Sequence, residues 1–316
     1  MDRILTLTLN PTLDLATAVD AVVAGPKLRC DAPEIDPGGG GINVSRAVRI
    51  LGGRSTAFAV SGGPTGEMLE HLLRGEGIAP VVLQGPGATR ESFSVTDRAT
   101  GAQYRFVLPG PPWRKIDSRQ ALAALTDAAQ PGDIVVLSGS QPPGVAADFP
   151  LALARAMARK SARLALDTSG PALRRIVERP CRRPILLLRM DGEEAADLAG
   201  HPLPAIRDSA DFAEAIVRRG VARIVIVARG AEGSVLVTSD RRLHGAPPPV
   251  RVVSKVGAGD SFTGAFVLAL ARGHDLACAL RNAVAAAASA VTTGATDLCE
   301  RAEVRRLAPL CRLVRV

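Results

Sequence analysis

Aromatic residues are scarce in this chain, because phenylalanine, tyrosine and tryptophan together make up 3% of its 316 residues. Proteins that bind single-stranded nucleic acid stack bases on aromatic side chains, and so small a supply provides no such platform. The net charge of +8 comes from dispersed arginines without a block of five or six like charges. We therefore expect no nucleic-acid partner and interpret the basic surface as one that favours anionic substrates.

Cysteine and histidine are also few and poorly placed for metal binding. The five cysteines are odd in number and form no C-x-x-C pair, and the four histidines show no spacing typical of metal ligands. This argues against a zinc site and a disulfide framework. Free thiols indicate a reducing compartment, so we expect a cytoplasmic protein.

Long apolar runs are missing as well, since none reaches the roughly 18 residues of a membrane helix. The chain enters a strand-like run, ILTLTLN, almost at once, without the basic and apolar segments of a signal peptide. With 47% hydrophobic and 22% charged residues, it has the profile of a globular chain with a large core and no membrane partner.

What is present is an alternation of short apolar runs with stretches of helical spacing. The apolar runs predict strands at 4–9, 57–60, 134–137, 163–166, 185–188 and 223–227. The helical spacing predicts helices at 42–51, 66–75, 118–129, 149–160 and 209–219. Continuous apolar strands separated by helices favour an α/β fold with a mostly parallel sheet covered on both faces.

Two regions interrupt this alternation, at about 12–36 and 88–109. The first holds the strand-like pieces LATAV and KLRC, and the second predicts a hairpin around Gly101. We place them together as a small β lid on the α/β body. An exposed sheet of this kind needs an apolar partner for one face, so we expect a homodimer that forms through the lid.

In open α/β sheets, ligands bind outside the carboxyl ends of the strands. This rule selects the segments that follow predicted strands: NPTLD (10–14), SGSQPPG (138–144), DTSG (167–170), RMDGEE (189–194) and ARGAEG (228–233).

The run DPGGGGINVSRA (36–47) places four glycines before a helix. It lacks the Gly-Lys-Ser/Thr of a Walker loop and the third glycine of a dinucleotide fingerprint, and it does not follow a clean predicted strand. Gly38 to Gly41 remove every side chain from one approach path, so that a polar ligand can reach backbone N–H groups at the helix start. Asn43 can donate to or accept from a hydroxyl there.

The stretch VGAGDSFTGAF (256–266) carries the second glycine motif. Gly257 and Gly259 permit a tight turn whose N–H groups form an anion-binding concavity, and the following helix adds its positive end. Asp260 next to this turn has two interpretations, a helix cap or a catalytic base, and the pattern alone leaves both open.

These motifs, in this order, resemble those of the PfkB (ribokinase-like) carbohydrate kinases over nearly the full length. The resemblance rests on NPTLD, KLRCDAP, PGGGGINVSRA, YRFVLPG, LSGSQPPGV, LDTSG, APPPV and VGAGDS, which look like the PfkB-type 6-phosphofructokinase branch. It implies a single domain over 1–316, a ribokinase-like three-layer sandwich with a small β lid. The related 1-phosphofructokinases usually carry lysine where this chain has Gly40, which favours fructose 6-phosphate as substrate.

The resemblance further implies phosphorylation of a sugar phosphate by ATP with Mg²⁺. Asp260 would accept the proton of the attacking hydroxyl, and the peptide N–H groups of Gly257, Ala258 and Gly259 would stabilise charge on the transferring phosphoryl group. The sugar phosphate would contact Asp14, Gly38, Gly39, Asn43, Arg90, Ser140, Lys27 and Arg29. The nucleotide would contact Asp191, Glu194, Ala228, Arg229, Gly230, Gly233, Gly257 and Gly259.

The chain departs from the family pattern in two nucleotide-site segments. Arg189 and Asp191 replace the Lys and Asn of Lys-Pro-Asn-x-x-Glu, while Glu194 falls on the family Glu. The added carboxylate would either strengthen Mg²⁺ binding by Asp191 and Glu194 or repel the nucleotide. Arg229, in place of a Leu, would supply a positive charge near the phosphates.

Three functions stay open from the sequence. The first is a 6-phosphofructokinase, which forms fructose 1,6-bisphosphate. The second is a related kinase for tagatose 6-phosphate, or a 1-phosphofructokinase. The third is a sugar-phosphate-binding protein with weak or lost catalysis, suggested by the changes at 189–194.

Overall fold

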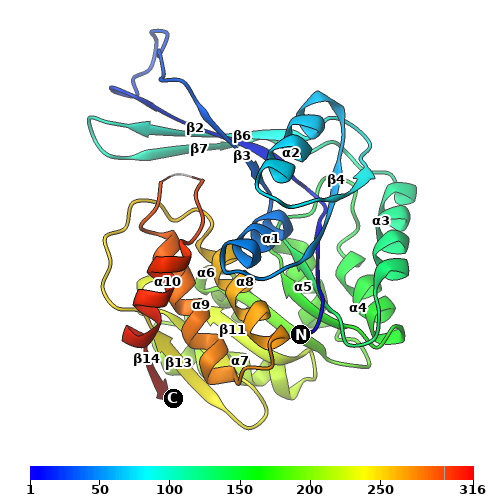
Figure 1. Cartoon of the computed structure of the whole chain (residues 1–316). Coiled ribbons are helices and arrows are strands. Elements are labelled where there is room, and N and C mark those ends of the chain that lie inside the picture. The colour runs from blue at the N-terminus through cyan, green and yellow to red at the C-terminus, as the bar shows by residue number, and fades with distance from the viewer. Residues whose placement is uncertain (295) are drawn as a thin grey trace.

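The computed structural model describes residues 1–294 and 296–316 and contains two sheets (Figure 1). The large sheet has ten strands in the order β14-β13-β12-β11-β10-β9-β8-β1-β4-β5. Its parallel part consists of β1 (Ile4–Thr8), β4 (Thr56–Ser61), β5 (Val81–Gln84), β8 (Ile134–Ser138), β9 (Arg163–Asp167), β10 (Ile185–Asp191) and β11 (Ala222–Ala228). Three antiparallel strands extend one edge: β12 (Ser234–Val237), β13 (Arg242–Ala246) and β14 (Arg312–Arg315).

Helices cover both faces of this sheet, because successive apolar residues of a strand point to opposite sides. Val135 and Leu137 of β8 face one core, whereas Ile134 and Val136 face the other. The first core is closed by α3 (Lys115–Ala128), α4 (Phe149–Arg159), α5 (Gly170–Glu178), α6 (Gly192–Ala199) and α7 (Ile206–Arg218). The second is closed by α1 (Gly40–Ile50), α8 (Ala258–Ala271), α9 (Leu276–Ala290) and α10 (Arg301–Leu307).

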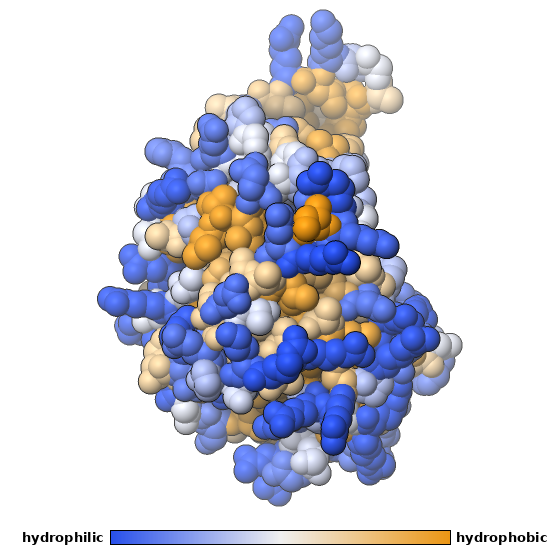
Figure 2. All heavy atoms as spheres, turned by 90° about the vertical axis from the view of Figure 1, so that its right-hand side faces the viewer, coloured by the Kyte–Doolittle hydropathy of each residue, from blue (hydrophilic) through white to orange (hydrophobic). Residues whose placement is uncertain are grey.

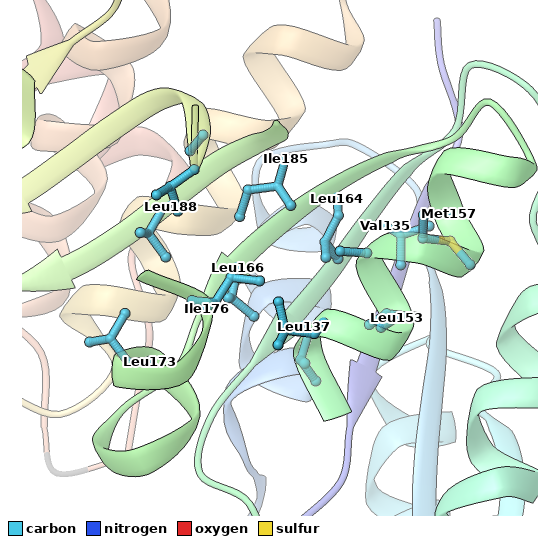
Figure 3. Packing of buried hydrophobic residues seen from close by; sticks show 14 of the residues in the cluster. Val135, Leu137, Leu153, Met157, Leu164, Leu166, Leu173, Ile176, Ile185 and Leu188 are labelled. Carbon is cyan, nitrogen blue, oxygen red and sulfur yellow. The ribbon is translucent and has the colours of Figure 1, made fainter. Parts of the chain in front are cut away.

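The first core shows how strands and helices interdigitate (Figure 3). Val135, Leu137 and Leu164 come from neighbouring strands and pack against Leu153 and Met157 of α4. Each of these five side chains is at most 2% exposed. The helices of this core, the large sheet and the helices of the second core form the three layers of the α/β fold that the sequence predicts.

The small sheet projects from the body with the order β3-β2-β6-β7 (Figure 1). Its strands are β2 (Thr12–Val19), β3 (Glu34–Gly38), β6 (Arg90–Asp97) and β7 (Gln103–Val107). The predicted hairpin is present as β6 and β7. The prediction of a strand at KLRC is wrong, since residues 20–33 form an exposed connection without regular structure.

Arg46 of α1 joins the small sheet to the body. Its side chain is 8% exposed and forms ion pairs with Asp36 of β3 and with Glu76, the residue that caps α2 (Gly63–Gly75). It also donates to the carbonyl oxygen of Pro37. These partners satisfy a nearly buried charge and hold the end of β3 against α1.

Some elements escaped the sequence analysis. Strand β5 and the antiparallel strands β12–β14 were not predicted, and the glycine run does follow a strand, β3, which belongs to the small sheet. Within the described residues, no helix combines the length and the apolar character that crossing a membrane requires.

The contact between α1 and α8 gives a test of the fold. A Cβ atom at Gly264 would lie 2.8 Å from Cβ of Ala47 and 3.0 Å from the carbonyl oxygen of Val44. We expect Gly264→Ala to lower the free energy of unfolding by about 1–2 kcal/mol, because overpacking outweighs the gain in helix propensity. Urea unfolding followed by circular dichroism measures the change.

Gly75→Ala is the matched control, because a Cβ atom at this helical glycine would contact nothing within 4 Å. It should leave stability unchanged or raise it slightly. Equal effects of the two substitutions would contradict the close contact between α1 and α8.

Candidate active site

Asp260 lies in the first turn of α8, but its carboxylate does not cap that helix. The residue at the cap position is Gly257, whose φ of 72° is the left-handed conformation that glycine adopts readily. The Asp260 carboxylate accepts hydrogen bonds from Nδ2 of Asn43 at 3.0 Å and Oγ of Ser138 at 3.2 Å. It is therefore held by α1 and by the end of β8, with the Gly257 turn beside it.

The surroundings of Asp260 raise its pKa to about 7. Burial is the main cause, and the negative charge of Asp167 adds to it, while hydrogen bonds from Asn43 and Ser138 and the charge of Arg189 act in the opposite direction. A carboxylate with a pKa near neutrality is a better general base than an ordinary aspartate.

Asp167 and Arg189 form an ion pair next to this turn. Nη1 of Arg189 lies 3.0 Å from Oδ2 of Asp167, which also accepts a hydrogen bond from Thr263 at 2.8 Å. The guanidinium stacks over the Phe262 ring, 5.5 Å from its centroid. A Cβ atom at Gly259 would lie 3.1 Å from two of its nitrogens. The absent side chain at 259 thus leaves room for the guanidinium of Arg189 beside the turn at 257–259.

The four-glycine run is shaped by close packing. A Cβ atom at Gly40 would lie 2.5 Å from N of Gly139 and from Oγ of Ser138, and one at Gly41 would lie 2.6 Å from the carbonyl oxygen of Leu7. The start of α1 thus rests directly on the ends of β1 and β8. The sequence analysis attributed the glycines to ligand access, whereas Gly40 and Gly41 are required by packing.

Gly38 makes room for Asp14, whose carboxylate occupies the space of the missing side chain. Burial raises the pKa of Asp14 to about 6, against a hydrogen bond from Thr12 and the charges of Arg90, Arg105 and Arg46. Gly39, with a φ of 108°, turns the chain from the small sheet into α1. Asp14 therefore lies where the small sheet meets the body.

Asn10 connects two of the residues expected to bind the sugar phosphate. The side-chain Nδ2 of Asn10 donates to Oγ of Ser140 at 3.2 Å. The backbone carbonyl oxygen of Asn10 accepts hydrogen bonds from Nε and Nη2 of Arg90 at 3.4 and 3.3 Å. Nη1 of Arg90 donates to the carbonyl oxygen of Leu108. The ends of β1 and β8 and the start of β6 thus meet at Asn10, which the sequence analysis did not single out.

Asp191 and Glu194 form a capping box at the start of α6. Each carboxylate accepts a hydrogen bond from the backbone N–H of the other residue, at 2.8 Å. Burial is the main cause that raises the pKa of Glu194 to about 7, and the charges of Asp191 and Asp167 contribute. A divalent cation would relieve this accumulation of negative charge, so these carboxylates suit Mg²⁺. The described residues contain no group of three or more His, Cys, Asp or Glu arranged to hold a metal alone.

The side chain of Arg229 contacts neighbouring loops of the protein, whereas the sequence led us to expect it near the nucleotide phosphates. Its guanidinium is 8% exposed, donates to the carbonyl oxygens of Leu203 and Pro204 and to Ser209, and pairs with Glu232. All three of its nitrogens are therefore engaged with the loop before α7 and the turn after β11. The expectation that Arg229 supplies charge to nucleotide phosphates finds no support in this geometry, because freeing the guanidinium would break these bonds.

The other expected nucleotide residues lie at the strand ends. Ala228 ends β11 beside Asp191 of β10, its register partner. Gly230 and Gly233 flank the short turn that leads into β12. By contrast, Lys27 and Arg29 lie in the exposed connection between β2 and β3.

This arrangement can activate a hydroxyl with Asp260 and bind anions at the α8 turn. A family model described as "pfkB family carbohydrate kinase" matches residues 7–303. The chain is 41% identical over 304 residues to an ATP-dependent 6-phosphofructokinase isozyme 2 of Mycobacterium tuberculosis, which covers 96% of this chain and 88% of that protein. The chain belongs to the pfkB family of carbohydrate kinases.

Three further matches show which proteins this pfkB kinase resembles. The Escherichia coli K12 enzyme of the same name is 38% identical over 97% of this chain and 98% of its own length. A solved structure of E. coli phosphofructokinase-2 in complex with fructose-6-phosphate matches with a TM-score of 0.91 and 36% identity, over 98% of this chain and 99% of that one. A 1-phosphofructokinase of Bacillus subtilis is 29% identical over 99% of this chain and all of that protein.

The raised pKa of Asp260 predicts a specific pH dependence of stability. The folded kinase binds this proton up to about pH 7, whereas the unfolded chain releases it near pH 3.8, so folding becomes less favourable as the pH rises between these values. Relative to the wild type, Asp260→Asn should therefore gain roughly 2–4 kcal/mol of stability between pH 4 and pH 8. Urea unfolding across this range measures the difference.

Asp197→Asn, at an exposed position on α6, makes the same chemical change. It controls for the loss of a carboxylate as such. A stability difference that stays flat with pH for Asp260→Asn would refute the buried, proton-binding state of the Asp260 carboxyl group.

Proposed function

We propose that this chain is an ATP-dependent 6-phosphofructokinase, which converts fructose 6-phosphate and ATP to fructose 1,6-bisphosphate and ADP. The observation that carries the proposal is Asp260, held by Asn43 and Ser138 beside the Gly257 turn. The names of the M. tuberculosis and E. coli relatives support this choice of substrate.

In this mechanism Asp260 accepts the proton of the attacking sugar hydroxyl. Asn43 and Ser138 fix the carboxylate at the end of the sheet, and the N–H groups of 257–259 face the phosphoryl group as negative charge builds on it. Phosphoryl transfer depends mostly on positioning and charge stabilisation, so a base with a pKa near neutrality suffices. Arg189 adds a positive charge next to this turn.

The sugar phosphate spans the junction between the body and the small sheet. Asp14 and Asn43 bind sugar hydroxyls, and Arg90 and Ser140 bind the phosphate of the substrate. Lysine at position 40, which the resemblance associates with 1-phosphofructokinases, would collide with the backbone at Gly139, because even a Cβ atom there lies 2.5 Å from its nitrogen. The chain therefore has no room at position 40 for the lysine that the resemblance associates with 1-phosphofructokinases.

ATP lies along the carboxyl ends of β10 and β11, near Ala228 and Gly230. Asp191 and Glu194 would hold Mg²⁺, which would neutralise charge on the phosphates of ATP. The changes at 189–194 therefore suit an active enzyme, because the extra carboxylate at 191 provides a hard oxygen ligand. The sugar-phosphate-binding protein without catalysis is the less favoured function for this reason.

The small sheet acts as a lid and as the contact between two subunits. Ile35, Leu15, Phe93 and Phe106 lie at paired registers across its four strands, so they form one apolar row. The ends of this row are exposed, Ile35 by 38% and Phe106 by 54%. Hydrophobic atoms are visible at the projecting end of the molecule, and further hydrophobic patches lie on the body (Figure 2). One solved structure of the E. coli enzyme is a tetrameric inhibited form, so larger assemblies occur in that relative.

Replacement of the proposed base tests the mechanism. Asp260→Asn should lower kcat by 10²- to 10⁴-fold, because the variant cannot accept the hydroxyl proton, and should leave KM for fructose 6-phosphate within a few-fold. A coupled ADP assay with Mg²⁺ measures both constants. Asp197→Asn serves as the control with unchanged activity, and a loss of less than tenfold in Asp260→Asn would show that another group takes the proton.

Arg90→Ala tests the phosphate site. We expect KM for fructose 6-phosphate to rise roughly 10- to 100-fold, as expected for the loss of a charge-assisted hydrogen bond, with little change in kcat. Arg119→Ala, at an exposed position on α3, is the control. An unchanged KM in Arg90→Ala would place the phosphate elsewhere.

Phe106→Glu tests the subunit contact. A charge in the apolar row should separate the subunits, so that the mass falls from twice 32.8 kDa to 32.8 kDa in light scattering coupled to gel filtration. Met68→Glu changes a residue on α2 that is 45% exposed and should leave the mass unchanged. A dimer that persists in Phe106→Glu would exclude this face as the interface.

A further inference from the structure

A cavity of about 300 Å³ lies at the amino ends of β9, β10 and β11. The walls come from the last turns of α4, the turn that leads into β9, and residues 183–186. Asp167, Asp191 and Ala228 end these same three strands at the opposite edge of the sheet. A five-residue strand spans roughly 16 Å, so the cavity is separate from the candidate active site.

The floor of the cavity is apolar. Met157, Leu164 and Ile185 line it and are shown in Figure 3, where they come from one helix and two neighbouring strands. They are 1%, 2% and 4% exposed, so they form the packed base of the cavity. The apolar surface that stays accessible comes from Ala158, Pro184 and Leu186 beside them. A preformed cavity of this volume with an apolar lining fits the body of a small organic molecule.

Three arginines, Arg163, Arg183 and Arg223, also line the cavity. Among the residues that the structure describes, the only carboxylate paired with any of them is that of Asp2, which contacts Arg163. Arg183 donates only to the carbonyl oxygen of Ala158, at 3.4 Å. The cavity therefore has an excess of positive charge.

One donor in this group is also unsatisfied. Nε of Arg163 is buried and has no hydrogen-bond partner, although its Nη2 donates to Asp2 and to the carbonyl oxygen of Gly132. This nitrogen is closed off from solvent, so a ligand in the cavity cannot reach it, and an anion there meets Arg183 and Arg223, which are exposed.

We propose that this cavity binds a small organic anion, with an apolar body of one ring or one branched chain and a terminal carboxylate or phosphate. The body lies on Ala158, Pro184 and Leu186, and the anionic group meets the arginines. This site does not depend on the proposed substrate of the kinase, because it is formed by other residues at the other edge of the sheet.

Isothermal titration at constant ionic strength tests the proposal with four probes. Phenyl phosphate and benzoate carry both features, inorganic phosphate carries the charge alone, and phenol carries the apolar body alone. We expect phenyl phosphate or benzoate to bind with a Kd below 1 mM, at least tenfold tighter than either single-feature probe. The tighter of the two identifies the anionic group. If neither exceeds the single-feature probes, the proposal fails.

Charge reversal locates the binding. Arg223→Glu should weaken binding of the better probe at least tenfold, and Arg183→Glu provides a second variant at the same cavity. Both residues are exposed, so the fold should tolerate the changes, which thermal unfolding checks. Arg159→Glu, exposed on α4 and outside the lining, should bind as the wild type does. Binding that survives both Arg223→Glu and Arg183→Glu lies at another site and overturns the proposal.

Discussion

The contact between α1 and α8 governs the geometry of the candidate active site. Asn43 and Ala47 are one helical turn apart on α1, and Asp260 and Gly264 are one turn apart on α8. The helices meet at Gly264 and Ala47, one turn below the hydrogen bond between Asn43 and Asp260. A larger residue in this contact would push the helices apart and lengthen that bond. Packing of small residues thus decides where the carboxylate of Asp260 lies.

The second feature that shapes the site is that only some of its buried carboxylates have a positively charged partner. Asp167 has a partner in Arg189, whereas Asp260 and Glu194 are held mainly by neutral donors, so burial raises the pKa of both to about 7. In the proposed kinase, this leaves Asp260 able to accept a proton and Glu194 ready for a cation. The same arrangement costs stability at neutral pH, as expected where function requires a buried carboxylate.

The changes from the family pattern have different structural consequences. Asp191 caps α6 and lies next to Glu194, so it can serve both the helix and Mg²⁺. Arg229 has become part of the scaffold, with its donors bound to the loop before α7. Sequence position placed both residues near the nucleotide, but the direction of each side chain depends on neighbours that are distant in sequence.

The sequence determined the α/β class, six parallel strands, the hairpin of the small sheet and the two glycine motifs, because apolar runs and glycine positions follow local rules. It left open whether Asp260 caps a helix, since the decisive partners, Asn43 and Ser138, lie 217 and 122 residues away. Only the tertiary structure decided this, together with the role of Asn10 and the packing at Gly40 and Gly41. It also brought three arginines and an apolar floor to one cavity. These features arise from contacts between segments far apart in the chain, which no local pattern records.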